Sequence, residues 1–133
     1  MATIIKTLDT DYIVNVSVQP VTLELIVGPV GQTSKTILTI DGQSPKDVTS
    51  GDLPDKVVGG LDVTLIGRNS ELGGRVLKIK TNISDTSKET NETELIVKVD
   101  GGKFGLKEYP MVLVVNDEGD DANYDVTINF ITS

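Results

Sequence analysis

The chain has 133 residues, the size of one ordinary domain, and contains neither cysteine nor histidine. The missing cysteines exclude disulfides and thiolate metal sites, and the missing histidines remove the usual general base and the commonest metal ligand. The net charge of −8 opposes binding to a nucleic-acid backbone, which needs clustered lysine and arginine. We therefore expect a single domain over residues 1–133 that is not an enzyme and binds no nucleic acid.

The N-terminal residues show no signal-peptide pattern, because no basic segment is followed by a long apolar one. No apolar run reaches the roughly 18 residues that a transmembrane helix needs. We expect a chain that is made in the cytosol, is not inserted in a membrane, and is incorporated into a virion or another assembly.

Strand patterns follow one another along the chain, and no segment has the period of an amphipathic helix. These patterns predict strands over residues 3–8, 12–18, 21–27, 36–40, 61–66, 75–83, 94–99, 111–115 and 124–131. A turn is expected at 9–11, and 43–60 is predicted to be a long connection with a short strand at 47–49. After a tight turn at 100–102, residues 103–106 are expected to return as a short hairpin partner.

Alternation within these strands predicts which side chains face solvent. Lys78, Lys80 and Asn82 share the solvent face of their strand. In two other strands the apolar residues are predicted to share one face, namely Val14, Val16 and Val18 in the first, and Leu61, Val63 and Leu65 in the second. The run 111–115 does not alternate, which favours a strand buried on both faces.

About nine strands at short, regular spacing predict an all-β fold, a single antiparallel β-sandwich with Greek-key connections. Immunoglobulin-like and jelly-roll topologies both fit this pattern. The cysteine and tryptophan signature of antibody domains is absent, since the chain has neither residue type.

A highly acidic segment, residues 116–125, separates the last two predicted strands and is expected to form a hairpin loop between them. Calcium binds six to eight hard oxygen ligands, so oxygen-bearing side chains crowded in one loop make a candidate calcium site. The candidate ligands are Asp117, Asp120, Asp121, Asn123 and Asp125. An EF-hand register that starts at Asp121 is broken, because Val126 stands where that loop needs glycine. The alternative, which we favour, is a solvated loop whose charges keep the strands soluble.

The other motifs in the sequence are weaker indications of function. The segment 28–36 resembles a phosphate-binding loop but lacks its spacing and its following helix. Glycosylation sequons occur at Asn15, Asn82 and Asn91. Glycan binding stays open as a second kind of contact, although we expect most of the five aromatic side chains to be in the core and so not available for stacking.

The leading hypothesis is a non-enzymatic structural module of a larger assembly, such as a phage virion decoration, capsid-accessory or fibre-associated protein, that forms a homo-oligomer. This is an analogy with small, acidic, helix-free accessory proteins. Residues 3–8 are the candidate strand for adding to a neighbour's sheet. The alternative hypothesis is a calcium-dependent ligand- or carbohydrate-binding β-sandwich domain that uses the loop 116–125.

Overall fold

The structure is a computed structural model that describes residues 3–28, 33–41, 46–48, 61–84, 92–115 and 120–133. Its elements are β1 (Thr3–Val14), β2 (Pro20–Gly28), β3 (Thr33–Ile40), β4 (Lys46–Val48), β5 (Leu61–Arg68), α1 (Asn69–Leu72), β6 (Val76–Ser84), β7 (Glu92–Asp100), β8 (Lys107–Val114) and β9 (Asp121–Thr132). The all-β prediction is confirmed, with one four-residue helix between β5 and β6 that the sequence did not predict.

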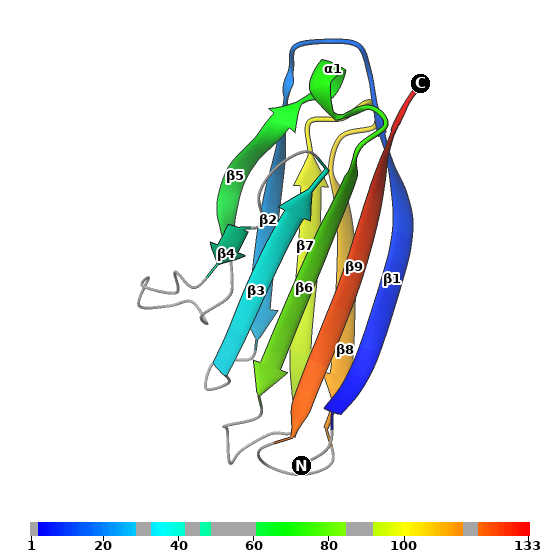
Figure 1. Cartoon of the computed structure of the whole chain (residues 1–133). Coiled ribbons are helices and arrows are strands. Elements are labelled where there is room, and N and C mark those ends of the chain that lie inside the picture. Colours follow the sequence, from blue (N-terminus) through cyan, green and yellow to red (C-terminus); the bar gives the residue numbers. More distant parts are fainter. Residues whose placement is uncertain (1–2, 29–32, 42–45, 49–60, 85–91, 116–119) are drawn as a thin grey trace.

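The strands form two sheets, which Figure 1 shows as two layers. The five-stranded sheet has the order β1-β9-β6-β3-β4, and the four-stranded sheet has the order β5-β2-β7-β8. Neighbouring strands are antiparallel with one exception, because β1 and β9 run parallel over their whole length. The prediction of a purely antiparallel arrangement is therefore wrong at this edge, where the first strand of the chain pairs with the last.

The buried side chains of both sheets belong to one hydrophobic core. Alternation places them there: in β9, Tyr124, Val126 and Ile128 are buried, while the residues between them point outward. The same pattern in β6 confirms that Lys78 and Lys80 lie on the solvent face.

The strand predicted over 12–18 is wrong in its bounds. Residues 3–14 form one continuous strand, with no turn at 9–11, and the chain leaves the sheet after Val14. Val16 and Val18 are 81% and 70% exposed. The Asn15 side chain accepts a hydrogen bond from the Ser17 amide, a local turn that competes with strand pairing.

The apolar residues of two edge strands face solvent, and the predicted burial of 111–115 on both faces is wrong. Alternation in β5 is present, but Val63 and Leu65 are 64% and 61% exposed, so the apolar side of this edge strand faces solvent. β8 is an edge strand too: Met111 is buried, whereas Val112 and Val114 are exposed. An apolar run without alternation here marks an apolar outer face and not burial on both sides.

The acidic segment does not join a hairpin. β8 belongs to the four-stranded sheet and β9 to the five-stranded sheet, so the connection crosses between layers. β9 already begins at Asp121, within the predicted loop. Residues 103–106 form no strand either; the hairpin partner of β7 is β8, which begins at Lys107. The predicted long connection at 43–60 lies largely outside the described residues, apart from β4.

One end of the molecule is closed by a buried asparagine. Asn69 Oδ1 accepts a hydrogen bond from the Asn15 amide, and Asn69 Nδ2 donates to the carbonyls of Gln19 and Gly101. Three connecting segments are thereby held together at one side chain. Gly101 has φ +99°, and a Cβ there would meet the carbonyl of Pro20, so this turn requires glycine.

Candidate functional site

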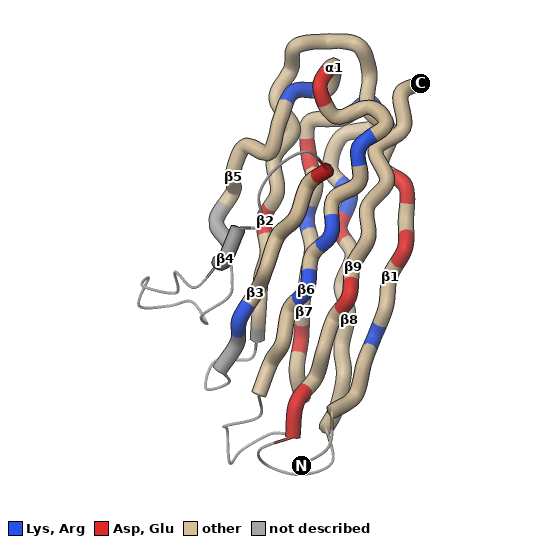
Figure 2. The backbone as a smooth tube through the Cα atoms, viewed as in Figure 1, with Lys and Arg blue, Asp and Glu red and all other residues tan. Residues whose placement is uncertain are grey.

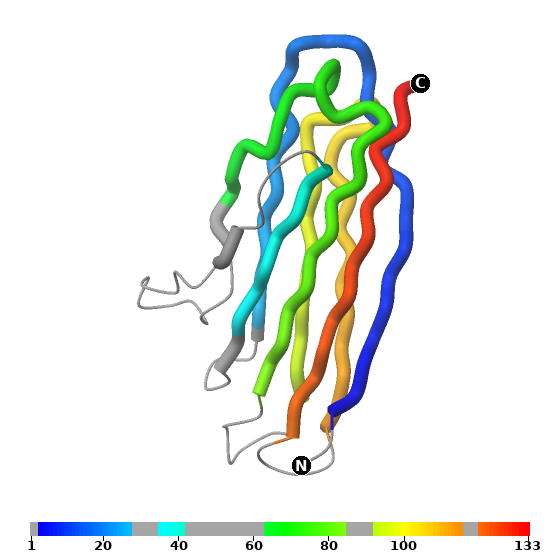
Figure 3. The backbone as a smooth tube through the Cα atoms, viewed as in Figure 1, coloured from blue at the N-terminus to red at the C-terminus, as the bar shows by residue number. Residues whose placement is uncertain are grey.

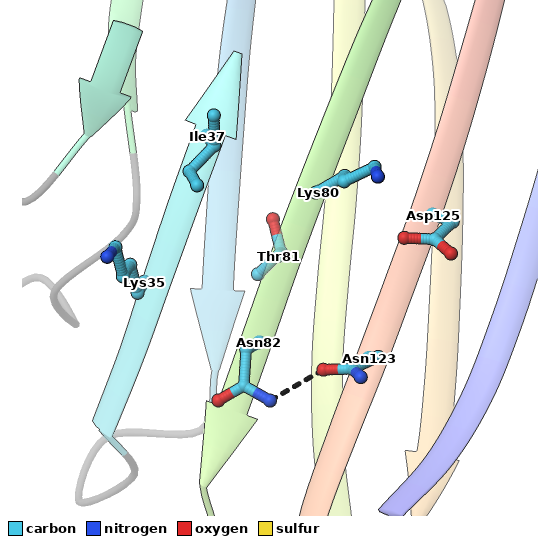
Figure 4. A pocket seen from close by; sticks show the side chains of 7 residues that line it. All are labelled: Lys35, Ile37, Lys80, Thr81, Asn82, Asn123 and Asp125. Atoms are coloured by element: carbon cyan, nitrogen blue, oxygen red, sulfur yellow. Dashed lines mark hydrogen bonds between the residues drawn. The ribbon is translucent and has the colours of Figure 1, made fainter. Parts of the chain in front are cut away.

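A shallow pocket of about 500 Å³ lies on the outer face of the five-stranded sheet (Figure 4). Three adjacent strands line it, β3, β6 and β9. The lining residues are Lys35, Ile37, Lys80, Thr81, Asn82, Asn123 and Asp125. The strand register explains the grouping, because Asn82 is paired with both Lys35 and Asn123, and Lys80 is paired with both Ile37 and Asp125.

The amide groups of this pocket are held in place. Asn82 Nδ2 donates a hydrogen bond to Asn123 Oδ1 at 2.5 Å (Figure 4). Ser84 Oγ donates to Asp121 Oδ1 at 3.0 Å, one row further along the strands. In contrast, the side-chain amines of Lys35 and Lys80 make no ion pair or hydrogen bond within the described part of the chain. The pocket therefore offers two amines for contacts outside the fold.

The chemistry of this pocket is that of a binding surface. It presents amines, amides and one carboxylate, which can donate and accept hydrogen bonds, whereas the Thr81 hydroxyl is buried and bonded to the Thr36 hydroxyl. A nucleophile beside a general base would be needed for acyl or glycosyl transfer, and the lining residues do not supply that pair.

The structure separates the candidate calcium ligands. Asp121, Asn123 and Asp125 occupy every second position of β9, so neighbouring side chains start roughly 6.8 Å apart and spread along the strand. A calcium ion needs all of its oxygen ligands within about 2.6 Å of itself. Asp120 is 5% exposed, and Asp117 lies outside the described residues. Among the described residues, no group of three acidic, histidine or cysteine side chains could hold a metal. A calcium site that includes Asp117 stays a prediction.

Polar groups inside the core are structural. Tyr124 Oη donates to the Thr93 carbonyl at 3.0 Å and contacts the Thr93 hydroxyl at 2.8 Å, which joins the two sheets. Burial raises the pKa of Tyr124 above its ordinary value. Tyr12 Oη donates to the Gly105 carbonyl and accepts from the Gly102 amide, and burial also raises the pKa of Tyr12. Sequence reasoning placed these tyrosines near the core but missed Asn69, which carries no pattern signal.

The outer face of the four-stranded sheet has a different character. Apolar side chains from four strands lie on it, and the charged side chains of Glu24, Glu92, Glu94, Lys98, Asp100 and Glu108 stand among them. The apolar residues are Ile26, Val63, Leu65, Ile96, Pro110, Val112 and Val114. A hollow of about 200 Å³ on this face is lined by Thr22, Glu24, Val63, Lys98, Asp100 and Leu106. Sequence reasoning missed this surface because it predicted that 111–115 is buried on both faces and could not tell which face of 61–66 lies outside.

Two further predicted features are the strand-adding segment 3–8 and the glycosylation sequons. Residues 3–8 pair with residues 121–126 of their own chain, and β1 is an edge strand, so one side of it is in use and the other faces outward. Of the sequons, Asn15 lies in the turn after β1, Asn82 lies in the pocket, and Asn91 is outside the described residues.

Comparisons with protein-family models, with curated proteins and with solved structures found no match to this chain. No helix in the described residues is both long enough and apolar enough to cross a membrane.

Proposed function

We propose that this chain is a non-enzymatic structural module that works through protein contacts in a larger assembly, such as a phage virion decoration, capsid-accessory or fibre-associated protein. The observation that carries the proposal is the apolar outer face of the four-stranded sheet. Val63, Leu65 and Val114 on this face are each more than 60% exposed. Exposed apolar residues grouped on one face are typical of a surface that another protein covers.

The composition of this face supports a protein partner. One row across β2, β7 and β8 is apolar, since Ile26 is paired with Ile96 and Ile96 with Pro110. Charged side chains flank it, and among them Lys98 and Glu108 form an ion pair at 3.5 Å. An apolar centre with a polar rim is the usual anatomy of a protein interface. The partner that fits is a protein surface with its own apolar patch.

We also propose that the two layers form an immunoglobulin-like Greek-key sandwich. In support, the neighbours β3-β6-β9 follow the order of strands C, F and G of an immunoglobulin domain, and β2 beside β5 follows strands B and E. The strands β7 and β8 are then an added hairpin that extends the second sheet. This order favours the immunoglobulin-like topology over the jelly roll.

The proposal of a non-enzymatic role rests on residue types. Without histidine or cysteine, the common nucleophile and base pairs cannot be built. The described surfaces present amides, amines, hydroxyls and aliphatic groups, all of which suit recognition.

Site-specific photo-crosslinking in the cell that makes the protein tests this function. A benzoylphenylalanine is placed at Val63 in one variant and at Val112 in a second, and Ser70, an exposed residue of α1, serves as the control position. We expect both face positions to give adducts with the same partner protein, identified by mass spectrometry, at several times the yield at Ser70. Adduct yields at Val63 and Val112 no higher than at Ser70 would overturn the proposal.

A further inference from the structure

On the outer face of the five-stranded sheet, lysines and aspartates lie on different strands (Figure 2); Lys6 of β1 is in register with the buried Tyr124 and so belongs to the inner side. The two strands on one side of this face carry lysines: Lys35 on β3, and Lys78 and Lys80 on β6. The two strands on the other side carry aspartates: Asp121 and Asp125 on β9, and Asp9 and Asp11 on β1. The boundary runs along the strands between β6 and β9. The face therefore has a basic half and an acidic half, side by side.

The lysines of the basic half make no ion pair within the described residues, although Lys80 is paired in register with Asp125. Two aspartates of the acidic half are held by neutral donors. Asn129 Nδ2 donates to Asp9 Oδ1 at 2.8 Å, and Ser84 donates to Asp121. The amines are thus available for an outside partner, and these two carboxylates are already oriented.

We propose that this face is the contact surface for a second copy of the chain. A two-fold axis that lies along the strands, between β6 and β9, places the basic half of each copy over the acidic half of the other. Such a contact is isologous, so every ion pair occurs twice. A rotation about this axis keeps each row at its height, and Lys80 then meets Asp125 of the second copy.

The residues between the charged side chains also favour this contact. The rows contain threonines and asparagines and no aromatic side chain, so two sheets can approach closely. The same rotation places β3 over β1 of the second copy. Half-buried Ile37 then lies over Thr7 of the second copy, and Ile5, which is 62% exposed, lies over the aliphatic stem of Lys35.

Charge complementarity selects this occupant over others. A nucleic acid or another polyanion would match the lysines and be repelled by the aspartates, and a polycation would meet the reverse problem. An apolar surface would leave both sets of charges without water or partners. A second copy matches both halves at once.

This inference deepens the proposed assembly role by naming one partner and its surface, but it uses a different sheet from the apolar face. The crosslinking positions Val63 and Val112 are untouched by any change on the charged face. Failure of one proposal is therefore distinguishable from failure of the other.

The test is analytical ultracentrifugation of the full chain and charge-reversal variants. The first variant carries Lys78→Glu with Lys80→Glu, and the second carries Asp9→Lys with Asp125→Lys. A control carries Lys103→Glu with Lys107→Glu, two exposed lysines outside this face, and changes the net charge as much as the first variant does. Circular dichroism and thermal melting establish that each variant is folded.

We expect the unaltered chain and the control to form dimers at about 50 mM salt and to dissociate at least tenfold more readily at about 500 mM, because salt screens exposed ion pairs. Each face variant alone should be a monomer, since its two halves carry the same sign. An equimolar mixture of the two should recover a heterodimer, because an acidic face then meets a basic one. An unaltered chain that stays monomeric at low salt, or a mixture that does not associate, overturns the proposal.

Discussion

The two outer faces of this molecule are made by the same kind of strand and differ in their content of exposed apolar side chains. On the five-stranded sheet the outward residues of β6 are Lys78, Lys80 and Asn82, and the face is polar and charged. On the four-stranded sheet the outward residues of β7 and β8 include Ile96, Val112 and Val114. Both sheets send their other side chains into one core.

This difference shows that the outward residues of the strands, and not the buried ones, indicate function in such a fold. Burial of the inner faces supplies most of the stability, so it constrains every second residue to be apolar. The outer residues are free of that demand. An apolar outer face therefore needs another explanation, and a covering partner is the simplest one.

The largest expected effect comes from comparing two adjacent residues of β7. Leu95 is fully buried between the sheets, and Leu95→Ala should lower the free energy of unfolding by about 3 kcal/mol through lost burial and a residual cavity. Ile96 faces outward, and Ile96→Thr should cost less than about 1 kcal/mol, since threonine keeps the strand preference. Urea unfolding of both variants measures the two values. Equal losses would show that the outer face is part of the core.

A second, smaller effect tests whether the two faces share one rigid scaffold. Asn69→Ala removes the side chain that holds three connecting segments, and the Asn15 amide and Gly101 carbonyl lose their partner. We expect a loss of about 2 kcal/mol, the usual scale for buried polar groups left unsatisfied. The control is Ser70→Ala, at the exposed neighbour, which should change stability by less than about 0.5 kcal/mol. Similar unfolding midpoints for the two variants would contradict this role.

A third effect concerns the polar link between the inner faces. Tyr124→Phe removes the hydroxyl that contacts Thr93 in the other sheet, and should cost about 1 kcal/mol at neutral pH. Thr7→Val, at an exposed threonine of β1, is a comparison change that also removes one hydroxyl.

The same tyrosine sets an alkaline pH dependence. Burial raises the pKa of Tyr124 above its ordinary value of 10.0, so below that pH both the folded and unfolded states keep the proton and the contribution to stability is complete. As the pH rises through the raised pKa, the unfolded state loses its proton first and stability falls. Because the chain has no histidine, stability should change little between about pH 6 and 8. Unfolding series across both ranges, with and without Tyr124→Phe, measure the two slopes; a slope at alkaline pH that the variant leaves unchanged would contradict the assignment.

Much of the fold could be predicted from the sequence, because alternation marks strands directly. Seven or more residues of alternating type predicted β6 and β9 closely, and the strand predicted over 21–27 is β2, which begins at Pro20. The pairing of β1 with β9 could not be predicted, since it joins the two ends of the chain and leaves no local signal. The turn at 9–11 was predicted from residue types that, in β1, simply face solvent at an edge.

The candidate site could be predicted only in part. The sequence identified the outward set Lys78, Lys80 and Asn82, but not that Asn123 and Asp125 would complete a pocket beside them. Acidic residues close in sequence were expected to converge in a loop. They lie instead in an extended strand, whose rise of about 3.4 Å per residue separates them. For β5, periodicity could say that one face was apolar but not that this face would be left outside, and for β8 the run without alternation gave no sign that one face is exposed. That choice depends on which sheet edge each strand occupies, a property of the whole fold.

The smallest expected effect on stability addresses the apolar face directly. Val112→Thr with Val114→Thr changes two outward residues of β8 to polar ones of similar shape, and we expect a change in the free energy of unfolding within about 0.5 kcal/mol. The matched control is Met111→Thr at the buried position of the same strand, which should cost about 2 kcal/mol or more because it buries a hydroxyl and loses packing. Binding of an apolar fluorescent dye should fall in the double variant and not in a variant of the charged face, such as Lys78→Glu with Lys80→Glu. A loss of stability as large as that of Met111→Thr would mean that Val112 and Val114 are held by the chain's own fold, and the contrast between the two outer faces would then disappear.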